Sequence, residues 1–194
     1  AMTFLGKEIV EVNGESIVVE KTKPGDFVVC NLASLTLGRI NVDDEQELQH
    51  VIQTTVRALD NVIDLNYYPL PYAKITNHQY RAIGLGTSGY HHLLSLKGIP
   101  FESEQHLQFV DQLYEKINYY TLEASCQLAR EKGSYAYFQG SDYDTGLYFQ
   151  KRHYHSSMWQ KLQKDIHQYG LRNGYCLAIA PTSSTSIIAG TTAA

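Results

Sequence analysis

The stretch "IGLGTSGYHH", residues 83–92, decides whether this chain is a dinucleotide-binding fold. Three of its glycines have the spacing G-x-G-x-x-G: Gly84, Gly86 and Gly89. That fingerprint requires a strand before the glycines, a helix after them and an acidic residue about twenty positions on, at the end of a second strand. Here the preceding residues, "NHQYRA", are polar, and Glu102 and Glu104 lie at the predicted start of a helix. We therefore expect no dinucleotide site and interpret the glycines as allowing close helix packing or a tight entry turn.

The composition is that of a globular domain. The 194 residues are 43% hydrophobic and 19% charged, which is enough to bury one sizeable core. The net charge of -4 argues against a nucleic-acid-binding surface, because such proteins carry a clustered excess of Lys and Arg. The sequence has no apolar run long enough to cross a bilayer, no signal-peptide pattern, and no repeat or linker. We expect a cytoplasmic protein with neither membrane nor nucleic-acid partners, in which residues 1–194 form a single unit.

Strand signals dominate the first forty residues. Residues 8–20 place two alternating apolar runs around Asn13-Gly14, which predicts a β-hairpin. The stretch "DFVVCNLASLTLGRI", residues 26–40, is rich in Val, Leu and Ile. It predicts a mostly buried strand that carries Cys30, followed by a second extended stretch.

From Asp44 the apolar residues change to a helical period. Their common face contains Leu48, Val51, Ile52, Thr55, Leu59, Val62 and Ile63. We expect this helix to end at Pro69 and Pro71, because the residue before a proline avoids the helical conformation.

Two more helices and a short strand follow. A long amphipathic pattern begins at Ser103 and stops at Gly133, and a shorter one runs from about Ser156 to Gly170. The stretch "YCLAIAP", residues 175–181, predicts a short buried strand. The chain is thus predicted to be helix-rich and of the α/β class.

Neither the histidines nor the cysteines form a metal-binding pattern. His91 and His92 are adjacent, so on a helix their side chains point about 100° apart, and no histidine pair has the i, i+4 spacing with a catalytic Glu. We expect solvated or packing histidines and no metal site. The cysteines are too few and too widely spaced for a disulfide framework or a zinc knuckle: Cys30, Cys126 and Cys176.

The stretch "APTSSTS", residues 180–186, lies between the predicted short strand and an apolar segment that can open a helix. Its hydroxyl side chains are Thr182, Ser183, Ser184, Thr185 and Ser186. The free N–H groups at a helix N-terminus, together with hydroxyl donors and the helix dipole, make an anion site suited to phosphate. A simple Ser/Thr N-cap accounts for the same residues. The spacing alone leaves both interpretations open.

Several motifs together resemble the large, catalytic subunit of ribonucleotide reductase. They occur in that family's order from about Phe27 to the end of the chain: "CNLASLTL", "ALDNVIDLNYYPLP", "RAIGLGTSGYHHLL", "IPFESE", "TLEASCQLAREKGSY" with "FQGS", and "IAPTSSTSIIAGTT". The resemblance implies a partial piece of that family's ten-stranded α/β barrel. It also implies that the glycine segment is a structural part of the barrel.

The resemblance implies thiyl-radical chemistry that reduces ribonucleotides at the 2′ carbon. Cys30 in "VVCNL" matches one member of the cysteine pair that supplies the electrons and becomes a disulfide. Without the resemblance, Cys30 would be read as a small buried apolar residue in a strand. Four residues match the loop that binds the substrate phosphates: Thr182, Ser183, Ser184 and Thr185. Some relatives have an acidic residue at the position of Ser183.

Other family features do not occur in these residues. The radical-bearing cysteine belongs to an N-x-C-x-E pattern, which none of the three cysteines has. The resemblance thus implies an internal fragment, inactive alone, that binds no cofactor itself. Its expected partners are the remaining large-subunit segments, a radical generator (a di-metal small subunit or adenosylcobalamin), the ribonucleotide, and a thioredoxin- or glutaredoxin-type reductant. The alternative is a non-catalytic module, derived from the barrel, that binds a nucleotide or a partner.

Overall fold

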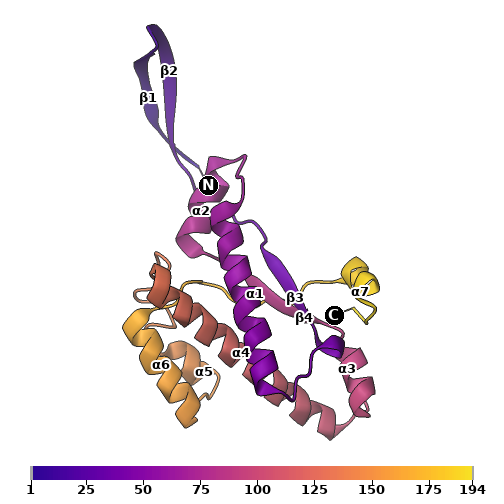
Figure 1. The fold of residues 1–194 in the computed structure, drawn as a ribbon. Helices are drawn as coiled ribbons and strands as arrows, with labels where there is room; N and C mark the ends of the chain where they lie inside the picture. The colour runs from indigo at the N-terminus through magenta and orange to yellow at the C-terminus, as the bar shows by residue number, and fades with distance from the viewer. Residues whose placement is uncertain (1, 194) are drawn as a thin grey trace.

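The fold, a computed structural model that describes residues 2–193, combines a hairpin, a small parallel sheet and seven helices within those residues (Figure 1). The elements in chain order are β1 (Thr3–Val12), β2 (Glu15–Lys23), β3 (Leu32–Thr36), the 3-10 helix η1 (Leu37–Arg39), α1 (Glu45–Leu65), α2 (Pro71–Tyr80), β4 (Gly84–Ser88), α3 (Tyr90–Lys97), α4 (Glu104–Lys132), α5 (Leu147–Lys151), α6 (Ser157–Tyr169) and α7 (Ser183–Ala189). No helix in this range is both long and apolar enough to span a membrane.

The predicted hairpin is confirmed and is longer than its sequence signal. β1 and β2 pair antiparallel, with Val12 opposite Glu15 next to the turn. Asn13 and Gly14 have φ of 53° and 82°, the left-handed pair that a two-residue hairpin turn requires. Figure 1 shows the hairpin projecting away from the rest of the molecule.

The first predicted helix, α1, is confirmed with its N-cap. The Asp44 carboxylate accepts hydrogen bonds from the amides of Gln46 and Glu47, which satisfies two free donors of the first turn. α1 packs along α4, and its buried stripe follows the predicted face closely, although Val62 is 46% exposed. The helix ends at Leu65, before the prolines.

Helix α2 was not predicted. Pro71 stands at its first turn, where a proline costs no hydrogen bond, so this residue begins a helix instead of only ending one. The rest of α2 is polar and weakly amphipathic, so its residues show no clear helical period of apolar side chains. Arg81 ends the helix in a left-handed conformation with φ of 47°.

Helices α4 and α6 have the predicted boundaries. Ser103 and Ser156 cap them by accepting hydrogen bonds from backbone amides, and Gly133 and Gly170 follow their last residues. α4 contributes to two hydrophobic clusters. One lies against α1 and the sheet, and the other is aromatic, built around Trp159 of α6.

The glycine segment forms a strand. β4 pairs in parallel with β3, with Leu85 opposite Ala33, and also bridges Leu177 on its other side. A Cβ on Gly86 would lie 2.2 Å from the carbonyl oxygen of Ala178, so glycine permits a close approach of two strand-like segments. The prediction of close helix packing was therefore wrong. The predicted entry turn is present at Gly89, which precedes α3 and has a left-handed φ of 71°.

The predicted strand over residues 175–181 is reduced to that single bridge. The amide of Ala178 donates to Leu85, and Leu85 donates to Cys176, so the segment lies alongside β4 without continuing as a ladder. Two strands and one bridge do not close on themselves, so residues 2–193 contain no closed barrel. The mixed, helix-rich class is confirmed.

A buried polar cluster joins α1 to the segments that enter the sheet. Asp60, fully buried on α1, accepts hydrogen bonds from Arg81 at 2.9 Å and from Asn173 at 3.3 Å. The side-chain amide of Asn173 also donates to the backbone carbonyl of Arg81. Because Arg81 precedes β4 and Asn173 precedes the bridging segment, this cluster fixes where both segments begin.

Candidate active site

A pocket of about 450 Å³ opens beside the amino ends of the two parallel strands. Its lining comes from the segment before β3, from α2, from the start of β4 and from the bridging segment: Asp26, Val28, Val29, Cys30, Asn31, Leu32, Thr76, Asn77, Tyr80, Ala82, Ile83, Gly84, Tyr175, Leu177 and Ala178. The lining is mostly apolar, and Cys30 contributes the single thiol. A volume of this size can hold a small ligand or several side chains of another segment.

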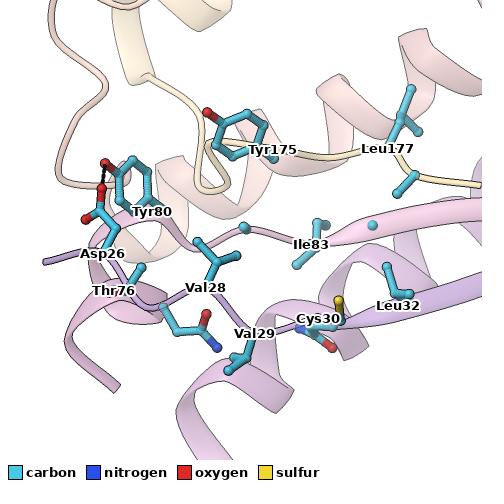
Figure 2. Close-up of a pocket in the computed structure, with 15 residues that line it drawn as sticks. Asp26, Val28, Val29, Cys30, Leu32, Thr76, Tyr80, Ile83, Tyr175 and Leu177 are labelled. Carbon is cyan, nitrogen blue, oxygen red and sulfur yellow. Dashed lines mark hydrogen bonds between the residues drawn. The ribbon is translucent and has the colours of Figure 1, made fainter. Parts of the chain in front are cut away.

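Cys30 does not lie in a buried strand, so that prediction was wrong. It is exposed and precedes β3, which begins at Leu32. In Figure 2 its sulfur points to the same side as Val28 and Leu32, toward Ile83 and Leu177. Alternate residues of an extended chain share a face, so Val28, Cys30 and Leu32 lie on one side of this segment.

The other two cysteines have a different environment. Burial raises the pKa of Cys126, on α4, to about 11, and raises that of Cys176 to about 12. Since the thiolate is the reactive form of a cysteine, both thiols are held in their inert state at neutral pH. Of the three free cysteines, only Cys30 is exposed.

The polar groups of the pocket lie at its edge. The Tyr80 hydroxyl donates to the Asp26 carboxylate at 3.1 Å (Figure 2). This hydrogen bond raises the pKa of Tyr80, so the phenol stays protonated and keeps its role as donor. No sequence pattern indicates this pair, because Tyr80 lies far from Asp26 in the chain and reaches it only through α2.

The hydroxyl-rich loop opens α7, as the sequence predicted. Thr182 is the N-cap residue, with a left-handed φ of 53°, and its side chain makes no capping hydrogen bond. Ser183, Ser184 and Thr185 are exposed, whereas Ser186 is buried and donates to the carbonyl of Ser183 at 2.9 Å. The Thr182 side chain therefore does not act as a simple N-cap of α7.

Cys30 and the hydroxyl loop lie at opposite ends of the sheet. Leu85 is paired with both Ala33 and Leu177, so these residues are level with each other. Cys30 precedes Ala33 at the amino end, and Thr182 follows Leu177 beyond the carboxyl end. Residues 182–185 do not line the pocket of Cys30.

Comparison with known proteins gives the family. A family model described as "Ribonucleotide reductase, barrel domain" matches residues 2–194. The chain belongs to the ribonucleotide reductase barrel-domain family. The recognition from motifs is thereby confirmed.

Three relatives, from two bacteria and a yeast, illustrate the similarity. The chain is 59% identical over 193 residues to a ribonucleoside-diphosphate reductase subunit alpha of Treponema pallidum, which covers 100% of this chain and 23% of the relative. It is 42% identical to the corresponding Helicobacter pylori subunit, over 91% of this chain and 24% of the relative. It is 36% identical to the large chain 2 of Saccharomyces cerevisiae, over 89% of this chain and 21% of the relative. The chain spans about a quarter of the length of these relatives.

Proposed function

We propose that this chain supplies one reducing cysteine and the substrate phosphate loop to a ribonucleoside-diphosphate reductase. The observation that carries the proposal is the environment of Cys30. It is the cysteine that matches the reducing pair, and it is also the exposed thiol facing a pocket, whereas Cys126 and Cys176 are buried. A thiol that exchanges with a disulfide must be reachable by its partner sulfur.

In the proposed reaction Cys30 acts together with a second cysteine that these residues do not supply. The two thiols give two electrons and two hydrogens to the ribonucleotide. The 2′ oxygen leaves as water, a C–H bond forms at the 2′ carbon, and one S–S bond joins the two sulfurs. A thioredoxin- or glutaredoxin-type dithiol then reduces that disulfide by exchange.

The proposed phosphate site consists of Thr182, Ser183, Ser184 and Thr185. Exposed hydroxyls and the first amides of α7 are the donors that a phosphate accepts. Support comes from the matching family motif and from the exposure of residues 183–185. Other barrel segments would complete the site between this loop and Cys30.

Radical generation is assigned to a separate component, either a di-metal small subunit or adenosylcobalamin. In residues 2–193, no group of three or more His, Cys, Asp or Glu side chains is placed to hold a metal ion. The proposed partners of this chain are the other large-subunit segments, the radical-generating subunit, the ribonucleotide and the dithiol reductant.

The proposal is tested by adding the matching remaining segments of a large subunit, with its radical generator, and measuring deoxyribonucleotide formation. We expect no activity from the chain alone and restored turnover in the assembled enzyme. Cys30→Ser should abolish turnover, while Cys126→Ser and Cys176→Ser keep it apart from modest packing losses. No turnover in any assembly would favour the non-catalytic binding module, and equal damage by all three substitutions in folded protein would contradict the role of Cys30.

The phosphate loop is tested separately by substrate affinity. The double variant Ser184→Ala with Thr185→Ala removes two exposed hydroxyls and should weaken ribonucleoside diphosphate binding in the assembled enzyme by about 1–3 kcal/mol, the scale of hydrogen bonds to a charged group. Ile187→Ala, at an exposed position of the same helix, is the matched control. Unchanged affinity in the double variant would remove this loop from the site.

A further inference from the structure

The segment that carries Cys30 is extended but is not part of the β ladder, so other contacts must hold it. On its amino side, the amide of Phe27 donates to the Thr76 hydroxyl at 2.8 Å, and Asp26 accepts from Tyr80 at 3.1 Å. Thr76 and Tyr80 are one helical turn apart on α2 and therefore share a face. A single face of α2 thus holds two successive residues of the segment.

The carboxyl side is held by a different pair of elements. The Asn31 side chain donates to the carbonyl of Leu59, on α1, at 2.8 Å. The carbonyl of Asn31 accepts from the amide of Gly84, at the start of β4, at 2.9 Å. Cys30 therefore lies between two anchored points, one on α2 and the other on α1 and β4.

We propose that Thr76 and Tyr80 are positioning residues for Cys30, holding its segment in the register that directs the thiol into the pocket. The inference rests on the proposed function of Cys30. In an extended segment a slip of one residue turns the thiol to the opposite face. Thiol–disulfide exchange needs two sulfurs aligned at bonding distance, so turnover depends on that register.

Thr76 is the stronger of the two anchors. Thr76 is buried, and its hydroxyl is the acceptor for the Phe27 amide, so removing it leaves that amide without its partner. The Tyr80–Asp26 hydrogen bond is exposed, so water can replace either partner, and its loss costs less free energy than loss of the Thr76–Phe27 bond. We expect the substitution at Thr76 to have the larger effect.

Variants of the tyrosines beside the pocket distinguish the contribution of the Tyr80 hydroxyl from that of the Tyr80 ring. The Tyr80 ring packs on Tyr137, with centroids 4.9 Å apart, and lies 6.5 Å from Tyr175. Tyr80→Phe keeps this aromatic cluster and removes only the hydrogen bond to Asp26. Tyr137→Phe is the matched control, because Tyr137 lies in the same cluster and does not line the pocket.

The test measures steady-state kinetics in the assembled reductase. Thr76→Val should lower kcat about tenfold with KM for the ribonucleoside diphosphate within about twofold, since a misplaced reacting group slows the chemistry without touching the phosphate loop. Tyr80→Phe should lower kcat by a smaller factor. Thr76→Ser, which keeps the hydroxyl, should restore turnover, and Tyr137→Phe should match the parent enzyme.

A second readout uses the 194-residue chain. A nitroxide attached to Cys30, the exposed thiol, should be more mobile in Thr76→Val and Tyr80→Phe than in the parent, with Thr76→Ser and Tyr137→Phe unchanged. Unchanged kcat and label mobility in Tyr80→Phe and Thr76→Val would overturn the positioning role, as would a raised KM with an unchanged kcat. Full turnover in Cys30→Ser would instead overturn the proposed function itself. If Thr76→Val fails to fold, Tyr80→Phe alone decides the result.

Discussion

Ile9 of the β1–β2 hairpin and Ile52 of α1 are the same residue type in opposite environments. Ile9 is 73% exposed. Ile52 is fully buried, in the hydrophobic cluster that α1 forms with α4 and the sheet. Both belong to well-formed elements whose type the sequence predicts. The difference lies in what surrounds each element: the two hairpin strands pair only with each other, whereas α1 packs against α4, β3 and α2.

The hairpin therefore satisfies its backbone without gaining a core. The cross-strand register places Val10 and Ile17 opposite each other, with Val19 on the same face. A two-stranded hairpin is at best marginally stable in water unless its apolar face is covered. Secondary structure alone thus contributes little net stability, and the helical body should carry most of it. Three predictions test this contrast, from the largest effect to the smallest.

The largest effect is expected where a buried charge loses its partner. Asp60→Ala leaves the buried Arg81 guanidinium with only Asp64 as its carboxylate and should cost about 3–5 kcal/mol of unfolding free energy. In the hairpin, Glu20→Ala breaks the exposed Lys7–Glu20 pair, for which we expect at most about 1 kcal/mol. Urea unfolding followed by circular dichroism measures both. Equal losses would contradict the contrast between the two regions.

The second prediction compares the two isoleucines directly. Ile52→Ala should destabilise the chain by about 2–5 kcal/mol, because it removes buried methyl groups and leaves a cavity. Ile9→Ala removes the same atoms from an exposed position and should change the unfolding free energy by less than about 0.5 kcal/mol. A large loss from Ile9→Ala, measured in the same urea titration, would show that the hairpin face with Ile9 and Val18 is covered in solution.

The smallest effect concerns an ion pair of intermediate exposure. Hydrogen bonding by Arg81 lowers the pKa of Asp64, whose side chain is 40% exposed. A carboxylate with a lowered folded pKa stabilises the protein above its unfolded pKa, about 3.9, and loses that contribution as the pH falls through the folded value. Asp64→Asn should therefore destabilise the chain at pH 7 and make no difference at the acid end. A pH-independent loss in urea titrations would mean that packing, and not charge, is responsible.

The elements that sequence reasoning found have local causes. The hairpin turn needs left-handed backbone at Asn13 and Gly14, and α1 and α4 need the side-chain acceptors of Asp44 and Ser103 at their first turns. Each requirement involves residues a few positions apart, so a single sequence displays it. Helix α2 is polar and has neither a capping side chain nor a clear apolar stripe, so the sequence did not predict it.

Only part of the candidate site can be predicted from such local patterns. Residue type and motif single out Cys30 and the loop at 182–185. They do not reveal that Cys30 is exposed and outside the strand, because a run of Val, Leu and Ile looks the same whether or not a neighbour covers it. The role of Gly86 was also hidden, since it depends on a carbonyl of Ala178, which is far away in the chain.

The sequence by itself determined the family, the helix-rich class, the hairpin and the boundaries of the long helices, because caps, turns and periodicity act over short distances. Only the tertiary structure decided which cysteine is reachable, that α2 holds the Cys30 segment, and that the glycine stretch is the middle strand between β3 and the Leu177 bridge. These properties arise from contacts between residues distant in the chain. Such contacts depend on which surfaces pack together after folding, and a local pattern of residues does not specify that packing.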